Sequence, residues 1–523
     1  MKNTNDAFQP PLFIQAMLNP EFYKHAVDNC QLIETHISWV ILTGDFVYKI
    51  KKPINLGFVD FSTLDKRKFY CEEELRLNRR LAPNIYLAVV PISGSVEIPL
   101  LSGNGKAFEY AVKMKQFSES MQLDHVLSRN ELNQNMINSF AELIAQFHQN
   151  IEIANEASDF GKPEQVYQPA KENFIQIREL ISDKPKLDTL SKIEQWTEDT
   201  FSEIKNILDQ RKKKGFIREC HGDLHLRNLA WHDNMPLAFD CLEFNENFRW
   251  IDVVSEIAFL IMDLEVQNKA ELSQYFLNKY LELTGDYKGC SLLRFYLVYR
   301  VMVRAKVDAI RAAQAGISQK EIEEVNEEID NYLQLALSYT QKPKPFIIIT
   351  HGMSGSGKST ITQPLLEKLG AIRIRADVER KRLFNIKPEQ NSSANIQQGI
   401  YTQQATNKTY LKLLELTKSI TDAGFPVIVD ATFSTIEQRN LFKDYASQQQ
   451  TYFVILDFIT SEETLRQRIR NRKNDVSDAD ITVLENQIKT WLPIEQNEEN
   501  DSVQIQTEEP LDIELLLSRL KLN

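Results

Sequence analysis

The chain has 523 residues, and its 61 Lys and Arg residues against 73 Asp and Glu residues give a formal net charge of −12. This length predicts about two to four domains, while the 42% hydrophobic and 26% charged content excludes wholesale disorder. The acidic balance argues against a broad non-specific binder of nucleic acid or membrane surfaces, although a local basic groove is compatible with it.

The first elements in chain order predict a small lobe of strands and one helix. Residues 35–61 have the pattern of a hairpin with a turn at Gly44-Asp45. Residues 65–80 have helical character, and Ala107–Phe117 fits another strand. From residue 131 onward, apolar residues recur at three- and four-residue spacing, which predicts a larger, mostly helical lobe.

A loop in this helical part carries residue types suited to phosphoryl transfer. It runs from His221 to Asn228 with the sequence His-Gly-Asp-Leu-His-Leu-Arg-Asn, and Asp240 follows a short predicted strand. Asp223 can accept the proton of a substrate hydroxyl, while Asn228 and Asp240 can hold Mg²⁺ against the phosphates of ATP. The alternative is a turn in which the histidine and aspartate only form hydrogen bonds. Glu243, just beyond, fits a substrate contact or a structural salt bridge.

On these residues, the chain over about 30–310 resembles the aminoglycoside phosphotransferase family, which has the two-lobed protein-kinase-like fold. The resemblance implies that a strand lysine paired with a helix glutamate binds ATP. Lys49 is the first candidate for the lysine, and Lys51 on the same strand face is the second. Glu74 is favoured over Glu73 as the partner. No glycine-rich phosphate loop precedes the lysine, and an exposed strand lysine is the alternative.

A predicted linker divides the chain into two domains. Gln341-Lys-Pro-Lys-Pro345 follows a long acidic helical pattern, and its two prolines cannot continue a helix. The expected boundaries are 1–340 for the first domain, 341–345 for the linker and 346–523 for the second domain. Beyond the linker, strands and helices alternate, which predicts a parallel sheet sandwiched by helices. The stretch Glu495–Glu509 is expected to be a loose acidic connection.

The second domain opens with a phosphate-binding motif. Residues 352–359 fit G-x-x-x-x-G-K-[ST] between an apolar strand and a helical pattern. Glycines let backbone N–H groups close around phosphate oxygens, while Lys358 can reach the β- and γ-phosphates of ATP and the Ser359 hydroxyl can hold Mg²⁺. A glycine-rich turn without a ligand is the alternative. The predicted ATP-binding residues here are Gly352, Met353, Ser354, Gly355, Ser356, Gly357, Lys358, Ser359 and Thr360.

Carboxylates after two further strands are candidates for acceptor chemistry. Asp377 follows the second strand, where it can accept a proton from a substrate hydroxyl, and Arg380 one turn on can hold the acceptor. Capping the helix that begins at Val378 is an alternative role for the aspartate, and both roles are compatible. Asp430 ends a later strand, where it fits the orientation of Mg²⁺-bound water or a plain strand end.

Four arginines alternate over residues 466–472 of a helical segment. Arg468 and Arg472 are four residues apart and therefore share a face of the helix. This arrangement suits a lid that neutralises a transferring phosphate and so contacts ATP. A solvated basic face is the alternative.

These features together make residues 345–495 resemble the P-loop kinases related to polynucleotide kinase and to zeta-toxin-type phosphotransferases. The resemblance implies that Lys358 and Ser359 bind ATP with Mg²⁺, that Asp377 is the general base and that the arginines form the lid. The residues that carry it are 352–359, 375–380, 430–433, 468–472 and Ser477-Asp-Ala479.

The fold predicted is an α+β protein-kinase-like two-lobed domain followed by an α/β P-loop domain with a parallel sheet. The function predicted is a bifunctional ATP-dependent phosphotransferase, each domain transferring the γ-phosphate of ATP to a hydroxyl of a small molecule or nucleotide-type acceptor. The acidic total does not favour a nucleic-acid acceptor, although the arginine segment is compatible with a polynucleotide end. The alternative is a P-loop kinase regulated by a non-catalytic nucleotide-sensing first domain, and a scaffold without catalysis has little support.

The number and spacing of the cysteines indicate the kind of cellular compartment in which the protein resides. Cys30, Cys71, Cys220, Cys241 and Cys290 are odd in number and never spaced C-x-x-C. This pattern excludes a disulfide framework and a zinc-ribbon site and is typical of a reducing compartment. The N-terminus lacks an apolar signal core, and no apolar run approaches the roughly 20 residues of a membrane helix. A cytoplasmic protein is therefore expected, and its oligomeric state is left open.

Overall fold

The computed structural model describes residues 9–57, 59–314, 316–386, 400, 402–471, 481–520 and 522. Its chain forms two compact units, and each is described by itself. The first unit consists of Met1–Pro169 and Asn206–Asp263, and the second consists of Ala170–Lys205 and Leu264–Asn523. The chain passes between them within helices α5 (Pro163–Leu180), α6 (Lys184–Lys213) and α8 (Val253–Val266).

A six-stranded antiparallel sheet forms the first part of unit 1. Its strand order is β1-β2-β3-β6-β4-β5. The predicted hairpin is confirmed, with Gly44 at a φ of 91° in the turn between β2 and β3. The strands are β1 (Gln31–Glu34), β2 (Ser38–Leu42), β3 (Phe46–Lys51), β4 (Tyr86–Gly94), β5 (Pro99–Leu101) and β6 (Glu109–Lys115).

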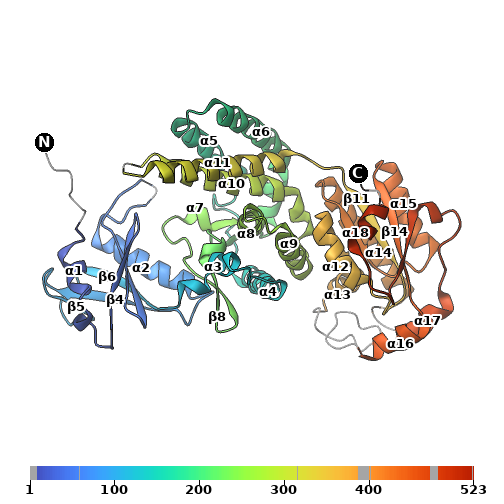
Figure 1. Cartoon of the computed structure of the whole chain (residues 1–523), viewed down its shortest axis with the longest axis horizontal. Coiled ribbons are helices and arrows are strands. Elements are labelled where there is room, and N and C mark those ends of the chain that lie inside the picture. Colours follow the sequence, from blue (N-terminus) through green and yellow to red (C-terminus); the bar gives the residue numbers. More distant parts are fainter. Residues whose placement is uncertain are drawn as a thin grey trace. The chain divides into compact units, whose positions relative to one another are not determined.

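Alternate residues of β3 face opposite sides of this sheet, as strand geometry requires. Tyr48 and Ile50 pack into an apolar cluster with helix α1 (Leu12–Met17). Val47 packs on the other side with Cys71 of helix α2 (Leu64–Asn78). Figure 1 shows α2 beside β4 and β6 of the sheet. The odd-numbered residues of β3, which include both candidate lysines, therefore face α2.

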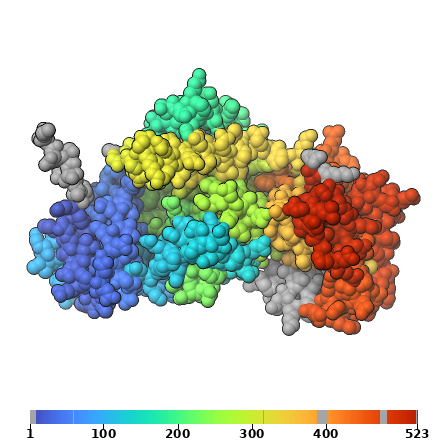
Figure 2. Space-filling view, in the orientation of Figure 1, coloured from blue at the N-terminus to red at the C-terminus, as the bar shows by residue number. Residues whose placement is uncertain are grey.

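Helices and two small two-stranded sheets complete unit 1. Figure 2 shows the surface of the first sheet, in blue, meeting that of helices α3 and α4, in cyan. One is the hairpin β8–β9, and the other pairs β7 with the distant strand β10; both are antiparallel and lie near the segment around residue 223 in the chain. The bounds are α3 (Leu123–Ser128), α4 (Gln134–Asn150), β7 (Ile217–Glu219), β8 (Leu229–His232), β9 (Met235–Ala238), α7 (Glu246–Arg249) and β10 (Trp250–Asp252).

Unit 2 contains a five-stranded parallel sheet in the order β12-β13-β11-β14-β15. The predicted alternation of strands and helices is confirmed, and Figure 1 shows helices α12, α14, α15 and α18 around the strands. The strands are β11 (Phe346–His351), β12 (Ile372–Arg375), β13 (Val427–Asp430), β14 (Tyr452–Ile459) and β15 (Ser502–Gln506). The helices that follow the predicted linker are α12 (Lys358–Leu369), α13 (Ala376–Leu383), α14 (Gln403–Asp422), α15 (Ile436–Gln448), α16 (Glu462–Asn471), α17 (Ile481–Thr490) and α18 (Ile513–Leu520).

Strand β15 corrects the expected loose connection over Glu495–Glu509. It pairs in parallel with β14 at the edge of the sheet. Its alternate residues Val503 and Ile505 pack against the core of the P-loop domain, and Ile505 is buried. The other residues of β15 are polar, and acidic residues precede the strand. Because an edge strand needs apolar residues on one face only, this short alternation is easily missed in the sequence.

Further helices of unit 2 precede its sheet in the sequence. They are α9 (Ala270–Thr284), α10 (Cys290–Ala312) and α11 (Gln319–Thr340), the last of which begins with a capping box formed by Ser318 and Glu321. Among the described residues, no helix is long and apolar enough to cross a membrane. All five cysteines are free thiols.

Candidate active sites

Two lysines of β3 meet one carboxylate of α2. Lys49 Nζ lies 2.9 Å from Glu74 Oε1, and Lys51 Nζ lies 2.7 Å from Glu74 Oε2. The neighbouring Glu73 pairs instead with Arg76 of the same helix. The structure thus brings Lys49 and Glu74 together as predicted, with the second candidate lysine beside them.

Asp240 reaches Lys49 from a distant part of the chain. Its Oδ1 accepts a hydrogen bond from Lys49 Nζ at 2.6 Å. The backbone N–H of Asp240 donates to the Tyr86 hydroxyl at 3.1 Å, and its φ of 61° is a left-handed conformation that few residues adopt without support. Burial lowers the pKa of Lys49, but the charges of Asp240, Glu74 and Glu243 outweigh burial and hold that pKa well above its ordinary value. Lys49 is therefore a fixed cation between two carboxylates.

Lys51 lies deeper than Lys49. Its side chain is 0% exposed, against 13% for Lys49. Its ammonium also forms a short ion pair with Glu243. Burial lowers the pKa of Lys51, but Glu243 and Glu74 outweigh burial and raise it above the ordinary value. Glu243 thus takes part in a structural salt bridge, which is the alternative foreseen from the sequence.

The loop from His221 to Asn228 presents Asp223. Asn228 Nδ2 donates to the backbone oxygen and to Oδ2 of Asp223, at 3.0 and 3.1 Å. Gly222 has a φ of 91°, and a Cβ there would lie 2.9 Å from the Phe248 carbonyl oxygen. Glycine is therefore required at the sharpest point of this loop. The structure brings the predicted Asp223 and Asn228 into direct contact.

His221 joins this loop to the residue before Asp240. Its Nε2 donates to the Phe239 carbonyl oxygen at 2.8 Å, and its Nδ1 accepts the Asp223 N–H at 3.3 Å. Burial lowers the pKa of His221, which favours the neutral ring that these two bonds require. The histidine therefore positions the segments that carry Asp223 and Asp240.

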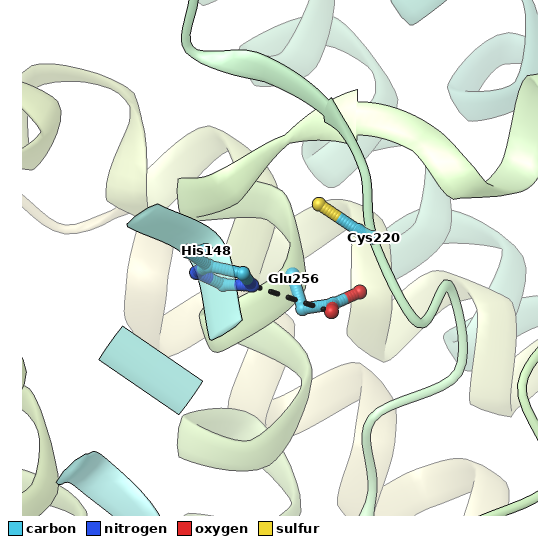
Figure 3. A group of neighbouring side chains, drawn as sticks. All are labelled: His148, Cys220 and Glu256. Carbon is cyan, nitrogen blue, oxygen red and sulfur yellow. Dashed lines mark hydrogen bonds and ion pairs between the residues drawn. The ribbon is translucent and has the colours of Figure 1, made fainter. Parts of the chain in front are cut away.

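The buried carboxylate of Glu256 on α8 anchors the same loop through two hydrogen bonds. Glu256 accepts the backbone N–H groups of His221 and Gly222, both at 2.7 Å, and its Oε1 lies 3.3 Å from His148 Nε2. Figure 3 shows His148 and Cys220 beside this carboxylate. The three residues could gather around a metal ion. Because both Glu256 oxygens already accept hydrogen bonds, we interpret the group as an anchor for the loop. Nothing in the sequence pattern indicated this role.

Replacing Glu256 with glutamine is expected to change the acid stability of the protein. Burial raises the pKa of Glu256, but the His148 and loop N–H bonds outweigh burial and lower it from an ordinary 4.5 to about 2. The ionised form therefore stabilises the fold above pH 4.5, by about 3 kcal/mol, and this contribution is lost as the pH falls from 4.5 to about 2. Glu256→Gln should lower the denaturation midpoint at neutral pH and flatten its decline over that acid range.

The control for this measurement is Glu72→Gln, an exposed glutamate on α2 that pairs loosely with Lys68. Its denaturation midpoint should follow the wild type at every pH, because exposed ion pairs contribute little. An acid decline in Glu256→Gln that is as steep as in the wild type would contradict the anchoring role of this carboxylate.

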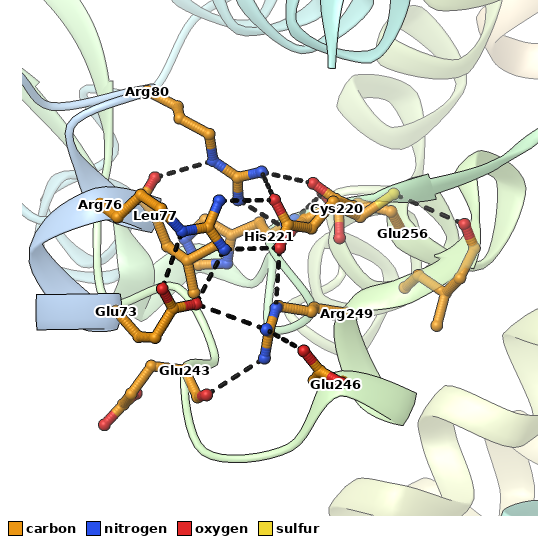
Figure 4. A network of polar contacts seen from close by, with 12 residues as sticks. Glu73, Arg76, Leu77, Arg80, Cys220, His221, Glu243, Glu246, Arg249 and Glu256 are labelled. Carbon is orange, nitrogen blue, oxygen red and sulfur yellow. Dashed lines mark hydrogen bonds and ion pairs between the residues drawn. The ribbon is translucent and has the colours of Figure 1, made fainter. Parts of the chain in front are cut away.

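Three arginines, from α2, from the segment after it and from α7, meet on the strand that precedes the loop. Arg76, Arg80 and Arg249 contact the Glu219 carboxylate at 2.7, 3.1 and 3.2 Å. Arg80 also donates to the Cys220 carbonyl oxygen at 3.1 Å. Figure 4 shows this network next to His221. It fixes the helix that carries Glu74 relative to the loop that carries Asp223, and sequence reasoning missed it because its members are far apart in the chain.

A cavity of about 660 Å³ joins these groups in unit 1. Its lining includes Lys49, Asp223, Asp240 and Glu243, together with the segment 115–119 that follows β6. Carboxylate and amide oxygens are the ligands that Mg²⁺ prefers, so the donor set of Asp240 and Asn228 fits that ion. The lysine between Glu74 and Asp240 fits an anionic ligand such as a phosphate.

The loop between β11 and α12 in unit 2 has the shape of a phosphate cradle. Gly355 and Gly357 have φ values of 86° and 89°, which favour glycine. A Cβ on Gly352 would lie 2.6 Å from the Ser356 hydroxyl, which is buried and has no hydrogen-bond partner among the described residues. Lys358 Nζ donates to the carbonyl oxygens of Gly352 and Met353 at 2.8 and 2.9 Å. The loop therefore fits a phosphate group that its backbone would surround.

Ser359 and Asp430 meet at the start of α12. The Ser359 hydroxyl donates to Asp430 Oδ2 at 2.6 Å. Arg375 Nε lies 4.0 Å from the same carboxylate oxygen. The hydroxyl and the carboxylate are oxygen ligands of the kind that Mg²⁺ prefers, so this pair fits a Mg²⁺ ion beside the cradle.

Asp377 and Arg380 lie in α13, directly after β12. Asp377 is half-buried in the first turn. Arg380 is 8% exposed and donates to the Ile400 carbonyl oxygen at 2.8 Å and to Thr406 Oγ1 at 3.2 Å. The arginine thus contacts Ile400 and the first turn of α14, and its acceptor role stays a prediction.

Helices α16 and α17 contact the cradle. Arg468 donates to the Gly355 carbonyl oxygen at 3.4 Å and to Thr507 Oγ1 at 3.0 Å. Gln487 Oε1 accepts the Ser354 N–H at 2.8 Å, and this glutamine is a residue that sequence reasoning missed. Arg472 and the Ser477-Asp-Ala479 motif lie outside the described residues. Of the other predicted cradle residues, Thr360 is exposed in the first turn of α12.

Two family models match this chain. Residues 71–293 match the phosphotransferase enzyme family, and residues 347–493 match an AAA domain. The first matched region is thus similar to phosphotransferase enzymes, and the second is similar to AAA domains. The fold prediction is thereby confirmed as a kinase-like domain followed by an α/β P-loop domain, and the two families indicate phosphotransferase or kinase activity.

The chain also resembles individual proteins. It is 28% identical over 446 residues to an uncharacterised protein of Mycobacterium tuberculosis (strain ATCC 25618 / H37Rv), covering 85% of this chain and 87% of that protein. Among solved structures, an amicoumacin kinase is 14% identical, covers 62% of this chain and 92% of its own, and gives a TM-score of 0.39. A sugar kinase from Janibacter sp. HTCC2649 is 20% identical, with coverages of 34% and 91% and a TM-score of 0.27.

Proposed function

We propose that the protein is a bifunctional ATP-dependent phosphotransferase in which each domain transfers the γ-phosphate of ATP to a hydroxyl group. The observation that carries the proposal is the contact of Lys49 with both Glu74 and Asp240 beside a cavity that Asp223 also lines. A cation for phosphate, a carboxylate for metal and a carboxylate for the acceptor proton are the groups that phosphoryl transfer needs. The proposed domains are residues 1–340 and 346–523, joined by 341–345.

In the first site, Lys49 would bind the phosphates of ATP and Glu74 would hold the lysine in place. Asn228 and Asp240 would hold Mg²⁺, which neutralises phosphate charge when bound. Asp223 would accept the proton of the acceptor hydroxyl. Asn228 would hold the Asp223 carboxylate in place for this step, through its hydrogen bond to Oδ2. The acceptor proposed is a small molecule or a nucleotide-type compound.

In the second site, the cradle of residues 352–360 would bind ATP, with Lys358 on the β- and γ-phosphates. Ser359 would hold Mg²⁺ with the help of Asp430. Asp377 would be the general base, and Arg380 would help to hold the acceptor. Arg468 would contact ATP from α16, as would Arg472, and the proposed compartment for both reactions is the cytoplasm.

One observation favours the alternative of a non-catalytic first domain that senses nucleotide and regulates the P-loop kinase. The turn between β1 and β2 consists of Thr35, His36 and Ile37 and contains no glycine. Protein kinases cover the phosphates of ATP with a glycine-rich loop at this place. A first domain without such a loop could bind nucleotide while transferring phosphate slowly or not at all.

Phosphate transfer from γ-labelled ATP to a pool of hydroxyl compounds and oligonucleotides distinguishes the two functions. The variants are Asp223→Asn and Asp377→Asn, and the matched control is Asp233→Asn, which alters an exposed aspartate in the β8–β9 turn. Loss of a general base lowers transfer by about 10²–10⁴-fold. We expect Asp223→Asn and Asp377→Asn each to erase a different labelled product, while the control retains both.

Two other labelling results would contradict the proposed bifunctional activity. Loss of all products in Asp377→Asn, with none lost in Asp223→Asn, would favour the regulatory first domain. Equal labelling in all variants, including the control, would contradict both assigned bases. The products themselves would identify the acceptors.

A further inference from the structure

Helix α9 lies within the residues that match the phosphotransferase family, yet it packs against the parallel sheet of the P-loop domain. Both elements belong to unit 2, and Figure 1 shows α9 beside α12. Asn278 Nδ2 donates to the Ala371 carbonyl oxygen at 3.0 Å, and its Oδ1 accepts the Arg373 N–H at 2.7 Å. The side chain of Asn278 thus pairs with the outer edge of β12 as a neighbouring strand would.

The strand residue held by Asn278 reaches the start of α12. Arg373 Nη1 donates to the Ser359 carbonyl oxygen at 3.1 Å, and its Nη2 donates to Gln363 Oε1 at 2.8 Å. Burial lowers the pKa of Arg373, and the neighbouring Arg375 lowers it further. The first connection therefore runs from α9 through β12 to the backbone of Ser359.

A second connection runs through charged side chains. Glu282 Oε1 on α9 accepts a hydrogen bond from Arg375 Nη1 at 3.4 Å. The same guanidinium lies 4.0 Å from Asp430 Oδ2, which accepts the Ser359 hydroxyl. Arg375 and Glu282 are each 14% exposed, and Asp430 is 5% exposed. At this burial, the charges interact more strongly than they would at the surface.

The backbone of α9 is fixed at the same place. Arg382 of α13 donates to the Glu282 carbonyl oxygen at 2.5 Å and forms a short ion pair with Glu379. Gly285 ends α9 with a φ of 73°, and a Cβ there would lie 2.7 Å from Arg382 Nε. The last turn of α9 therefore has a defined position against β12 and α13, which are the elements that carry Arg375 and Asp377.

We propose that Asn278 and Glu282 are positioning residues of the P-loop site, so that this site is completed by a helix of the phosphotransferase-family domain. This proposal rests on the function proposed above for the P-loop domain. Glu282 shares Arg375 with Asp430. Without the Glu282 charge, Arg375 would interact more strongly with Asp430, and Asp430 would then be less available to Ser359 and to Mg²⁺.

Nucleotide binding by the full chain tests the proposal without an acceptor. The background carries Lys49→Met, which disables the first predicted site, and the probe is a non-hydrolysable ATP analogue titrated with excess Mg²⁺ or with EDTA. Glu282→Gln should weaken binding in Mg²⁺ by about fivefold, which is within the range for residues that act through a network. In EDTA the affinity of Glu282→Gln should stay within about twofold of that of the Lys49→Met protein, because Glu282 acts through Asp430, which is proposed to help hold Mg²⁺.

Two variants serve as controls on the same helix. Glu271→Gln removes another α9 carboxylate that contacts the P-loop domain, through an exposed ion pair with Lys368 at 3.0 Å. It should bind as the background does in both titrations. Glu282→Asp keeps the charge near Arg375 and should recover part of the lost affinity. Thermal unfolding of each variant reports whether the helix still packs.

The other binding results would contradict either the positioning role of Glu282 or the proposed function of the P-loop site. If Glu282→Gln binds like Glu271→Gln while Lys358→Ala abolishes binding, the positioning role is wrong and the proposed P-loop function stands. If Glu282→Gln weakens binding equally in Mg²⁺ and EDTA and lowers Tm, the residue only supports the fold, and the positioning role is again wrong. If Lys358→Ala binds like the background, both the P-loop function and this inference fail.

Discussion

Lys51→Met is expected to destabilise the protein by about 3–5 kcal/mol, because it leaves the buried Glu243 carboxylate without its cation and removes one of the two lysines that contact Glu74. The Lys51 side chain is 0% exposed, and Glu74 and Glu243, its partners, are 0% and 4% exposed. A methionine fills a similar volume but offers no charge. The denaturation midpoint measures the loss, and Lys66→Met provides the control, because Lys66 pairs with Asp60 at an exposed site and such pairs contribute about 0–1 kcal/mol.

Lys49→Met tests the neighbouring lysine of the same strand face. Its ammonium lies between Glu74 and Asp240 and lines the cavity. We expect Lys49→Met to lower phosphate transfer by the first site more than Lys51→Met does. The expected loss is about 10²–10³-fold, which is the range for removing one preorganised charge that contacts a phosphoryl group. Glu74 keeps its contact with Lys51, so the fold should lose less stability than in Lys51→Met.

The comparison of the two variants decides which lysine serves ATP. The assignment would be wrong if Lys51→Met kept its stability but lost phosphate transfer by the first site, while Lys49→Met retained that transfer. The sequence allowed both lysines, since they share a strand face, and only their different depth separates them.

Lys358→Ala is expected to abolish nucleotide binding at the P-loop site, with transfer by that domain reduced about 10²–10³-fold. The Lys358 ammonium is held by the Gly352 and Met353 carbonyl oxygens. A phosphate bound in the cradle would exchange these neutral partners for its charged oxygens, which form stronger hydrogen bonds. Alanine removes that interaction but leaves the glycine conformations of the loop intact.

The matched control is Lys368→Ala, which removes an exposed lysine near the other end of the same helix. Equilibrium binding of labelled ATP, measured in the Lys49→Met background, should distinguish the two alanine variants. Equal binding by both would mean that the cradle does not bind nucleotide. The first-site product should be unaffected by Lys358→Ala in the otherwise wild-type chain.

Local patterns identified the elements whose information is contiguous in the sequence. The cradle at residues 352–359 and the loop at 221–228 each need their residues on one short backbone segment, and the structure forms both. The strand and helix alternation after residue 345 was also visible, because each buried parallel strand is a short apolar run. Strand β15 was missed because only one face of its five residues is apolar.

The sequence by itself determined the two motifs, the two fold classes and the residue types suited to phosphoryl transfer, because each depends on local spacing. Only the tertiary structure decided which groups meet. Lys49 and Asp240 are 191 residues apart when they form their hydrogen bond, and Glu256 reaches the loop from a separate helix. Likewise Asn278 and Arg373, which lie 95 residues apart, join α9 to β12 across the predicted linker. Such contacts depend on the packing of whole helices and strands, which no short stretch of sequence specifies.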